Sequence, residues 1–339
     1  MMNLFHRKPV RVLLHAFRSR IGGLRTLLRR VWTRVIVSDH RLYDLYARLK
    51  GYREERLRVA SRIGYEPNLR TPHTLNEKIL WKKLNVRDPL LTRTTDKIAV
   101  REYVREKLGG EAESLIIPIL HVADTPADLA LDDCALPYVV KANHSWNTNL
   151  FVQERHADGR FTVSQVNQPA SQWTRQQIYA QCNRWLASRH GLREHEWAYQ
   201  KIPPRLFIEP FIANPDGSRL IEAKVDCFHG TPTYVLAILG GRERSHHTLL
   251  DAAGHRLPVQ YNDAEEVSDH VLDQVQAVLP RLRDYASRLS ADFDYCRVDF
   301  YVMAETVHLS EITHYPASGC RRMGLQYDRE MGRHWRLAT

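Results

Sequence analysis

The sequence has no long hydrophobic run. Among its 339 residues the best apolar stretches, Leu115–Leu120 and Tyr234–Leu239, have only the length of single strands. A helix that spans a bilayer needs roughly 18 or more consecutive apolar residues, so we exclude a transmembrane protein. Arginines interrupt the N-terminal segment throughout, which excludes a secretory signal with its apolar centre. We therefore expect a cytoplasmic protein.

Cysteine is scarce and irregularly spaced. The five cysteines are Cys134, Cys182, Cys227, Cys296 and Cys320, and none of them forms a C-x-x-C motif. Structural zinc sites and redox pairs use closely spaced thiols, so we expect neither. The odd number of cysteines fits free thiols in a reducing compartment.

Acidic residues are absent from residues 1–37, which contain nine lysines and arginines. The whole chain has 49 Lys+Arg and 39 Asp+Glu, a net charge of +10, so this basic arm accounts for nearly all of it. Its apolar residues recur every three or four positions, which predicts an amphipathic helix. These residues are Leu13, Phe17, Ile21, Leu24, Leu28, Val31 and Val35.

The basic arm has three interpretations. It packs on the body of the protein, lies on an anionic membrane surface, or binds nucleic acid. No RNA- or DNA-binding motif occurs elsewhere in the sequence, so we do not expect a nucleic-acid partner. The first two interpretations stay open, and the second places the protein peripherally at the inner face of the cytoplasmic membrane.

The rest of the chain alternates helical and strand-like segments. Hydrophobic residues make up 43 % and charged residues 26 %, which fits a folded protein and excludes wholesale disorder. Periodicity predicts helices at 39–63, 74–84, 96–108, 174–188 and 269–289. Strands are predicted at 115–120, 138–141, 150–153, 206–212, 219–228, 231–239, 296–302 and 306–311. This order predicts an α+β fold with antiparallel pairs in its second half.

The last two predicted strands contain the most informative polar residues. Alternation puts Arg297, Asp299 and Tyr301 on one face of the first strand, and Glu311 and Thr313 on one face of the second. Antiparallel pairing then brings Asp299 and Glu311 within reach of one Mg²⁺, which favours carboxylate and phosphate oxygens. Arg297 would face a phosphate or an oxyanion. The alternative is a surface ladder of ion pairs.

Two lysines occupy places that suit a phosphate group. Lys141 ends an apolar strand just before Ala142–His144, and Lys97 begins a predicted helix, where anions are favoured. The segment Glu209–Ile212 follows another apolar strand and predicts a hinge against which an adenine ring stacks. Taken one at a time, each lysine is better explained as a solvated side chain, and the hinge alone is a weak signal.

In this order, the segments resemble the TupA-like branch of the ATP-grasp superfamily over most of the chain. The matching segments are Asn68–Pro72, Thr74–Ile79, Asp96–Arg101, Val140–His144, Arg297–Asp299 and Glu311–Pro316. The resemblance implies an ATP-grasp fold, in which a preATP domain precedes two α+β lobes that hold ATP between them. It divides the chain into the basic arm at 1–37, a helical segment with a preATP-like domain at 38–137, and lobes at 138–213 and 214–339.

The resemblance also implies which residues bind the nucleotide. They are Lys97, Lys141, Asn143, His144, Glu209, Phe211 and Lys224. Lys97 and Lys141 would contact the phosphates, and Glu209 would face the adenine amine with the backbone of Phe211 nearby. Lys224 matches a family lysine of uncertain role.

For the metal, the resemblance implies Asp299 and Glu311 as Mg²⁺ ligands. Thr313 stands where the superfamily usually has an asparagine, which leaves the third ligand open. Arg297 would stabilise the reacting acyl phosphate. We expect four residues beyond these strands to contact a substrate carboxylate, with a solvated basic pair as the alternative. They are Ser318, Gly319, Arg321 and Arg322.

One segment departs from the family. The loop after Asn143–His144 is usually rich in glycine and closes over the phosphates, whereas Ser145–Asn149 contains no glycine. Asparagine tolerates left-handed backbone conformations, so the turn can survive. Trp146 is then in a position to cap the site.

The activity implied by the resemblance is an ATP- and Mg²⁺-dependent carboxylate–amine ligase with an acyl-phosphate intermediate. The branch is associated with bacterial surface polysaccharides, which implies an acidic sugar or acidic amino acid as substrate. Two alternatives stay open. One is an ATP-grasp phosphotransferase, and the other is a non-catalytic, membrane-associated assembly protein with a degenerate nucleotide site. The oligomeric state is not predicted.

Overall fold

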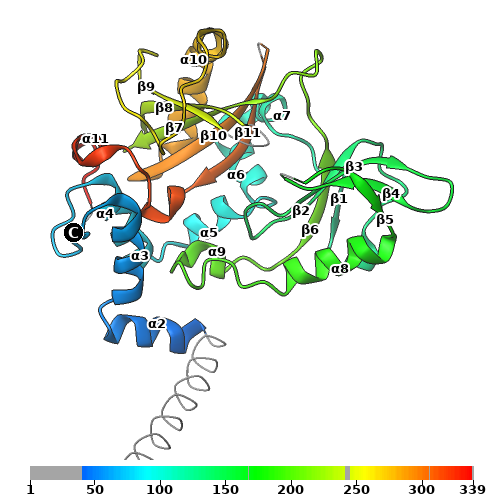
Figure 1. Cartoon of the computed structure of the whole chain (residues 1–339), viewed down its shortest axis with the longest axis horizontal. Helices are drawn as coiled ribbons and strands as arrows, with labels where there is room; N and C mark the ends of the chain where they lie inside the picture. Colours follow the sequence, from blue (N-terminus) through cyan, green and yellow to red (C-terminus); the bar gives the residue numbers. More distant parts are fainter. Residues whose placement is uncertain (1–39, 167, 241–244, 305, 338–339) are drawn as a thin grey trace, which may run out of the picture. The chain divides into compact units, whose positions relative to one another are not determined.

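The computed structural model describes residues 40–166, 168–240, 245–304 and 306–337 (Figure 1). The chain divides into two compact units, Met1–Leu57 and Arg58–Thr339. The helix predicted within residues 1–37 lies outside the described residues. Among those that are described, no helix combines the length and the apolar composition that crossing a membrane requires.

The helical prediction for 39–63 is confirmed, with one interruption. Helix α2 (His40–Leu49) belongs to the first unit, and α3 (Arg53–Ile63) extends from the first unit into the second. Between them Gly51 and Tyr52 have φ values of 59° and 52°. A left-handed residue just past the last helical turn is a common way for a helix to end, so α2 stops here.

A six-stranded antiparallel sheet, which we call sheet A, has the strand order β1-β6-β2-β3-β4-β5. Its strands are β1 (His121–Ala123), β2 (Tyr138–Ala142), β3 (Asn149–Arg155), β4 (Phe161–Ser164), β5 (Ser171–Trp173) and β6 (Leu206–Pro210). Helix α8 (Arg175–Leu186) lies along this sheet (Figure 1) and buries Ile178 and Cys182 in the core that the sheet shares with it. Thr174 caps the start of α8 in a capping box with Gln177.

A five-stranded antiparallel sheet, which we call sheet B, has the order β11-β10-β7-β8-β9. Its strands are β7 (Ile221–Phe228), β8 (Thr231–Leu239), β9 (His246–Asp251), β10 (Tyr295–Met303) and β11 (Thr306–Thr313). The long helix α10 (Asp269–Ser290) covers one face of this sheet (Figure 1). Val298, Phe300 and Val302 of β10 are fully buried in the core that includes α10. Because strand residues alternate, Arg297, Asp299 and Tyr301 lie on the opposite face.

Shorter helices surround the two sheets. They are α4 (Leu75–Asn85), α5 (Pro89–Thr95), α6 (Val100–Leu108), α7 (Ala112–Leu115), α9 (Trp197–Gln200) and α11 (Gly324–Arg333), with 3-10 turns at Gly109–Glu111, Pro126–Asp128 and Pro316–Gly319. Thr74 and Glu77 form a capping box that starts α4. Asn76, in the first turn of α4, donates from its backbone and its side chain to Asp328 of α11. This contact ties the C-terminal helix to α4.

The α+β fold class predicted from the sequence is confirmed, but one predicted strand is wrong and one predicted helix begins later than expected. The strand at 115–120 is replaced by a helical turn that ends at Leu115, and Pro118 interrupts the run because proline has no N–H to donate to a sheet. Contact with β6 begins only at the end of the run, where the Leu120 N–H donates to the Ile208 carbonyl at 2.7 Å and the register starts with His121 opposite Ile208. The helix predicted from Asp96 begins at Val100, because the Asp96 carboxylate accepts the Ile98 N–H at 2.8 Å and holds a turn.

Candidate functional site

The polar face of sheet B brings together the residues predicted for the metal. Asp299 on β10 lies directly opposite Glu311 on β11, and Arg297 lies opposite Thr313. On the other side of β10, the partner of Asp299 is Lys224 on β7. Directly opposed residues have Cβ atoms about 4.5–5.5 Å apart. The juxtaposition that alternation predicts for Asp299 and Glu311 is therefore present.

Asp299 is the more enclosed of the two predicted metal ligands, with only 1 % of its side chain exposed. Arg297 donates from Nε at 2.7 Å and from Nη2 at 2.6 Å, one bond to each carboxylate oxygen. Lys224 Nζ lies 3.4 Å from Asp299 Oδ2 and 2.7 Å from Glu222. Burial raises the pKa of Asp299, and the charges of Arg297 and Lys224 oppose that rise.

Glu311 is the more accessible of the two predicted ligands. Its carboxylate lies 3.5 Å from Lys97 Nζ. Burial alone would raise the pKa of Glu311, but the positive charges of Lys97, Lys224 and Arg297 outweigh it and lower the pKa. Glu311 is therefore ionised at neutral pH, as a metal ligand must be.

A second cluster lies on sheet A. The opposed pairs are Val139 with Glu209 and Lys141 with Phe207, so Lys141 and Glu209 share a face of adjacent strands. Lys141 Nζ contacts one oxygen of Glu209, and Arg101 Nη2 donates to the other at 2.9 Å. Each carboxylate oxygen of Glu209 is thus paired with a cationic side chain.

Arg101 is a candidate residue that the sequence prediction missed. It lies in α6, four residues after Lys97, and contacts the Lys97 carbonyl oxygen as well as Glu209. The matching segment Asp96–Arg101 contained it, and the spacing of four is the signal that was available.

Asn143 and His144 are fully enclosed behind the site. Asn143 donates to the Asp96 carboxylate at 3.0 Å and accepts the Arg205 N–H at 2.7 Å, and its carbonyl accepts the Lys97 N–H at 3.2 Å. His144 Nε2 is 3.2 Å from the Trp185 carbonyl, and burial lowers the pKa of this imidazole. Both residues thus lie where they position Lys97 and the following loop.

Phe211 and Trp146 are exposed aromatic residues at the edges of this region. Phe211 follows β6 directly; its ring lies edge-on to Phe151 at 5.8 Å, and its N–H donates to the Pro137 carbonyl at 3.1 Å. Trp146 is 64 % exposed and lies edge-on to His190. An exposed ring beside a charged site is suited to stacking on a planar ligand.

The glycine-poor loop keeps its turn. Asn147 has a φ of 56°, the left-handed conformation that asparagine tolerates. Behind Trp146, the ring of His190 lies 4.9 Å from that of Tyr199. Burial raises the pKa of Tyr199, and Glu311 adds to the rise. A row of rings therefore extends from the loop through His190 to Tyr199.

The donor set fits a magnesium–polyphosphate ligand. Its cations are Lys97, Arg101, Lys141, Lys224 and Arg297, and its carboxylates are Glu209, Glu222, Asp299 and Glu311. Within the described residues, no group of three or more His, Cys, Asp or Glu side chains is arranged to hold a metal ion. Two carboxylates that leave the other positions to phosphate and water suit Mg²⁺ better than metals that need a full protein cage.

A family match agrees with this geometry. The model of the TupA-like ATP-grasp family matches residues 77–336, well over half of the sequence. This chain belongs to the TupA-like ATP-grasp family. The resemblance inferred from the motifs is therefore confirmed, and Lys97, Lys141, Asp299 and Glu311 all lie within the matched residues.

Solved structures with remote likeness include ligases. N5-carboxyaminoimidazole synthase from Aspergillus clavatus, in complex with ADP, is 14 % identical over 69 % of this chain and 46 % of that one, with a TM-score of 0.33. D-alanine–D-alanine ligase from Bacillus anthracis, complexed with ATP, is 12 % identical over 66 % and 55 %, with a TM-score of 0.35. The Helicobacter pylori enzyme is 14 % identical over 73 % and 60 %, also at 0.35.

The extent of these matches is limited. The chain spans between 46 % and 60 % of the length of these three proteins, and similarities of this size carry no inference about activity. No curated protein sequence matches the chain.

The substrate residues expected in this ATP-grasp protein need one correction. Arg321 is fully buried, donates to both oxygens of Asp226 at 2.7 Å, and donates from Nε to the Tyr261 hydroxyl at 2.5 Å. Its guanidinium is therefore enclosed in the core and has no access to a substrate. The sequence Arg321-Arg322 alone contains no pattern that would predict a buried side chain at one position and an exposed one at the other.

The other three expected substrate residues differ in accessibility. Ser318 is half-buried, and its hydroxyl accepts bonds from Lys83 at 2.8 Å and Arg58 at 3.1 Å. Gly319 is buried, and a Cβ there would lie 3.1 Å from the Asn76 carbonyl oxygen. Arg322 faces solvent and pairs with Asp263 at 2.5 Å. Arg322 and Ser318 thus stay candidates.

Proposed function

We propose that this chain is an ATP- and Mg²⁺-dependent ligase that joins a carboxylate to an amine. The observation that carries the proposal is the register of sheet B, which sets Asp299 opposite Glu311 and beside both Arg297 and Lys224. Two carboxylates and two fixed cations on neighbouring strands suit the Mg²⁺ and the phosphates of one nucleotide. Bound there, MgATP would supply the phosphoryl group that activates the carboxylate as an acyl phosphate.

The residues divide into three tasks under this proposal. Asp299 and Glu311 would hold Mg²⁺, with Thr313 next to them as the further oxygen. Lys97 and Lys224 lie within 3.5 Å of these carboxylates. Phosphate oxygens that bind Mg²⁺ there would therefore lie next to both ammonium groups. Their fixed positions lower the cost of reorganising charge during phosphoryl transfer.

Arg297 would stabilise the reacting acyl group. Its Nε and Nη2 are held by Asp299, which fixes the guanidinium plane and leaves Nη1 to donate. An arginine fixed in this way is suited to an oxyanion that develops next to the metal.

Glu209, Lys141 and Arg101 would form the nucleotide end of the site. Burial alone would lower the pKa of Lys141, but the Glu209 carboxylate outweighs it and raises the pKa, so the ammonium stays charged. Glu209 would hold both cations in place and accept the adenine amine, and the exposed ring of Phe211 lies two residues further on for the base to stack on.

Product analysis tests this function. The protein is incubated with MgATP, an amine and an acid, with D-glucuronate and L-glutamate as the first acids. A ligase gives ADP, phosphate and an amide, and hydroxylamine in place of the amine gives the hydroxamate of the acid. A stable phosphoester that hydroxylamine does not consume would show a phosphotransferase instead. The control variant is Asp273→Asn, an exposed residue of α10 on the other side of sheet B.

The location of the protein in the cell is a separate part of the proposal. The charge and periodicity of residues 1–37 support a peripheral site on an anionic membrane, and the family resemblance supports a role in bacterial surface polysaccharide synthesis. Deletion of residues 1–37 should abolish sedimentation with vesicles that contain anionic lipid. Equal sedimentation of the full and the shortened chain would contradict this location.

A further inference from the structure

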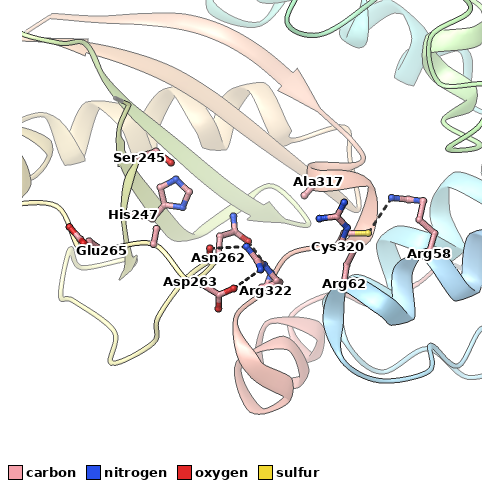
Figure 2. A pocket seen from close by; sticks show the side chains of 11 residues that line it. Arg58, Arg62, Ser245, His247, Asn262, Asp263, Glu265, Ala317, Cys320 and Arg322 are labelled. Carbon is pink, nitrogen blue, oxygen red and sulfur yellow. Dashed lines mark hydrogen bonds and ion pairs between the residues drawn. The ribbon is translucent and has the colours of Figure 1, made fainter. Parts of the chain in front are cut away.

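A pocket of about 740 Å³ is lined by residues of α3, of β9 and of the segment that follows sheet B (Figure 2). Arginines line it from two directions. Arg58 and Arg62 extend from α3, and Arg322 extends from the segment that follows sheet B. Arg58 and Arg62 lie outside residues 77–336, so the family match assigns nothing to this side of the pocket.

The two α3 arginines face the pocket together because residues four apart lie on one side of a helix. Arg58 donates to the Ser318 hydroxyl at 3.1 Å and to Cys320 Sγ at 3.4 Å. Arg62 is exposed and makes no ion pair within the part of the chain that the structure describes. Across the pocket, Arg322 pairs with Asp263 (Figure 2) and keeps 47 % of its side chain exposed. The pocket therefore presents guanidinium groups to its opening.

Ala317, which lines the pocket, begins a strained piece of backbone. Ala317, Ser318 and Gly319 have φ values of 49°, 55° and 74° in succession. Left-handed conformations cost free energy in residues other than glycine, and they persist where the surroundings fix them. Here Lys83 and Arg58 both donate to the backbone carbonyl and the hydroxyl of Ser318. Strain held in this way is typical of ligand-binding segments.

The pocket is connected to the carboxylates of sheet B by one face of that sheet. Cross-strand pairing aligns His247 on β9 with Ile238 on β8 and Glu222 on β7 in one row, next to the row of Lys224 and Asp299. His247 lines the pocket, and its Nδ1 has no hydrogen-bond partner among the described residues. A ligand in the pocket would therefore lie at the end of the charged face on which the proposed chemistry occurs.

Resting on the proposed function, we propose that this pocket, through Arg58, Arg62 and Arg322, binds an oxyanion of the second substrate, either a carboxylate or a phosphate group. Guanidinium groups bind both oxyanions through paired N–H donors. With its oxyanion held there, this substrate would extend from His247 along the polar face of sheet B toward Lys224 and Asp299. The enzyme would thus select a second substrate that itself carries an acidic group.

Calorimetric titration of the full chain tests this site. The probes are D-glucuronate, inorganic phosphate and D-glucose, added in the presence of Mg²⁺ and a non-hydrolysable ATP analogue. Arg62→Ala removes a cation without breaking an ion pair, Arg62→Lys keeps the charge, and Arg283→Ala on α10 is the matched control. We expect glucuronate or phosphate to bind and glucose not to bind. Arg62→Ala should raise the Kd of the anion about tenfold, while Arg62→Lys raises it less and Arg283→Ala leaves it unchanged.

The outcomes separate this site from the proposed function. Binding of glucuronate alone identifies a carboxylate, and binding of phosphate alone identifies a phosphorylated substrate. Anion binding that Arg62→Ala does not weaken, or no anion binding while the ATP analogue still binds, overturns the pocket and leaves the ligase proposal standing. Anion binding that depends on Arg62 in a protein that does not bind the analogue keeps the pocket and contradicts the ligase proposal.

Discussion

Two buried arginine–aspartate pairs lie next to each other at sheet B and differ in their further hydrogen-bond and ion-pair partners. Arg297–Asp299 is on β10, and Arg321 pairs with Asp226 of β7, which lies directly opposite Arg297. Both pairs use two parallel hydrogen bonds of 2.6–2.7 Å. The hydrogen bonds within the two pairs therefore do not show which pair is structural and which is functional.

Their neighbours do. Asp226 and Arg321 are both fully buried, and their further hydrogen bonds go to neutral groups, the hydroxyls of Tyr261 and Tyr295 and the amide of Asn76. Arg297 and Asp299 instead adjoin Lys224 and Glu311, which charged residues of other elements approach in turn. A buried pair whose further hydrogen bonds go to neutral groups indicates a structural role, whereas a pair within a larger set of ionised groups indicates a ligand site.

The largest effect on stability is expected at the Arg321–Asp226 pair. Arg321→Met leaves the Asp226 carboxylate buried without its cation, which should lower the free energy of unfolding by about 3–5 kcal/mol. Urea denaturation measures this. The double variant Asp226→Asn/Arg321→Met should recover part of the loss because no charge is left unpaired. A single variant with less than about 1 kcal/mol of destabilisation would contradict the structural role.

The Arg297–Asp299 pair should affect catalytic activity more than stability. Asp299→Asn keeps the volume and one acceptor but removes the charge that would hold Mg²⁺, so we expect phosphoryl transfer to slow at least about 100-fold. Single-turnover formation of ADP measures this, with Asp273→Asn as the control. If Asp299→Asn formed ADP at the control rate, the two pairs would no longer differ in function.

Arg101 extends the comparison to sheet A. Arg101→Met leaves Glu209 with Lys141 as its cation and removes a charged hydrogen bond from the proposed nucleotide end of the site. We expect ATP binding to weaken about tenfold with little change in unfolding free energy. Titration with the ATP analogue measures the Kd. An unchanged Kd, together with an unfolding loss of several kcal/mol, would place Arg101 with Arg321 as a structural arginine.

The smallest expected effect concerns pH. Burial, with the positive charge of Lys97 adding to it, lowers the pKa of His190 from 6.5 to about 4. The folded state thus binds fewer protons than the unfolded state in this range, so His190 should make stability fall as the pH drops from about 6.5 to 4. The partial exposure of His190 reduces the effect. His190→Gln should flatten this part of the stability profile, and an identical slope in both proteins would contradict it.

The sequence predicted local relations better than distant ones. Alternation indicated that Asp299 and Glu311 could meet across two neighbouring strands, but their exact pairing depends on a β-bulge between Asp299 and Phe300. Without that bulge the hairpin register would set Ser310 opposite Asp299, and the sequence pattern did not reveal it. The buried position of Arg321 depends on Asn76 and Tyr261, 245 and 60 residues away in the chain, and no local pattern encodes such contacts. Arg321 and Arg322 are adjacent in sequence yet one is enclosed and the other exposed.

The same limit applies to the fold. Long periodic elements such as α10 were predicted within a residue or two, whereas the short strands β4, β5 and β9 were not predicted. β5 has three residues, too few to show a period of two, and exists because β4 pairs with it. Arg101 was missed for a different reason: its spacing from Lys97 was visible, but its acidic partner Glu209 comes from a strand 108 residues later.

Thermal and urea unfolding with and without MgATP tests the central claim most directly, on the wild type, Asp299→Asn and Asp273→Asn. A ligand at about 100 times its Kd stabilises a protein by about 2.7 kcal/mol. We predict this stabilisation for the wild type and for Asp273→Asn, and its loss in Asp299→Asn. An equal effect of MgATP on all three proteins, or no effect on the wild type, would contradict a metal-linked nucleotide site on the polar face of sheet B.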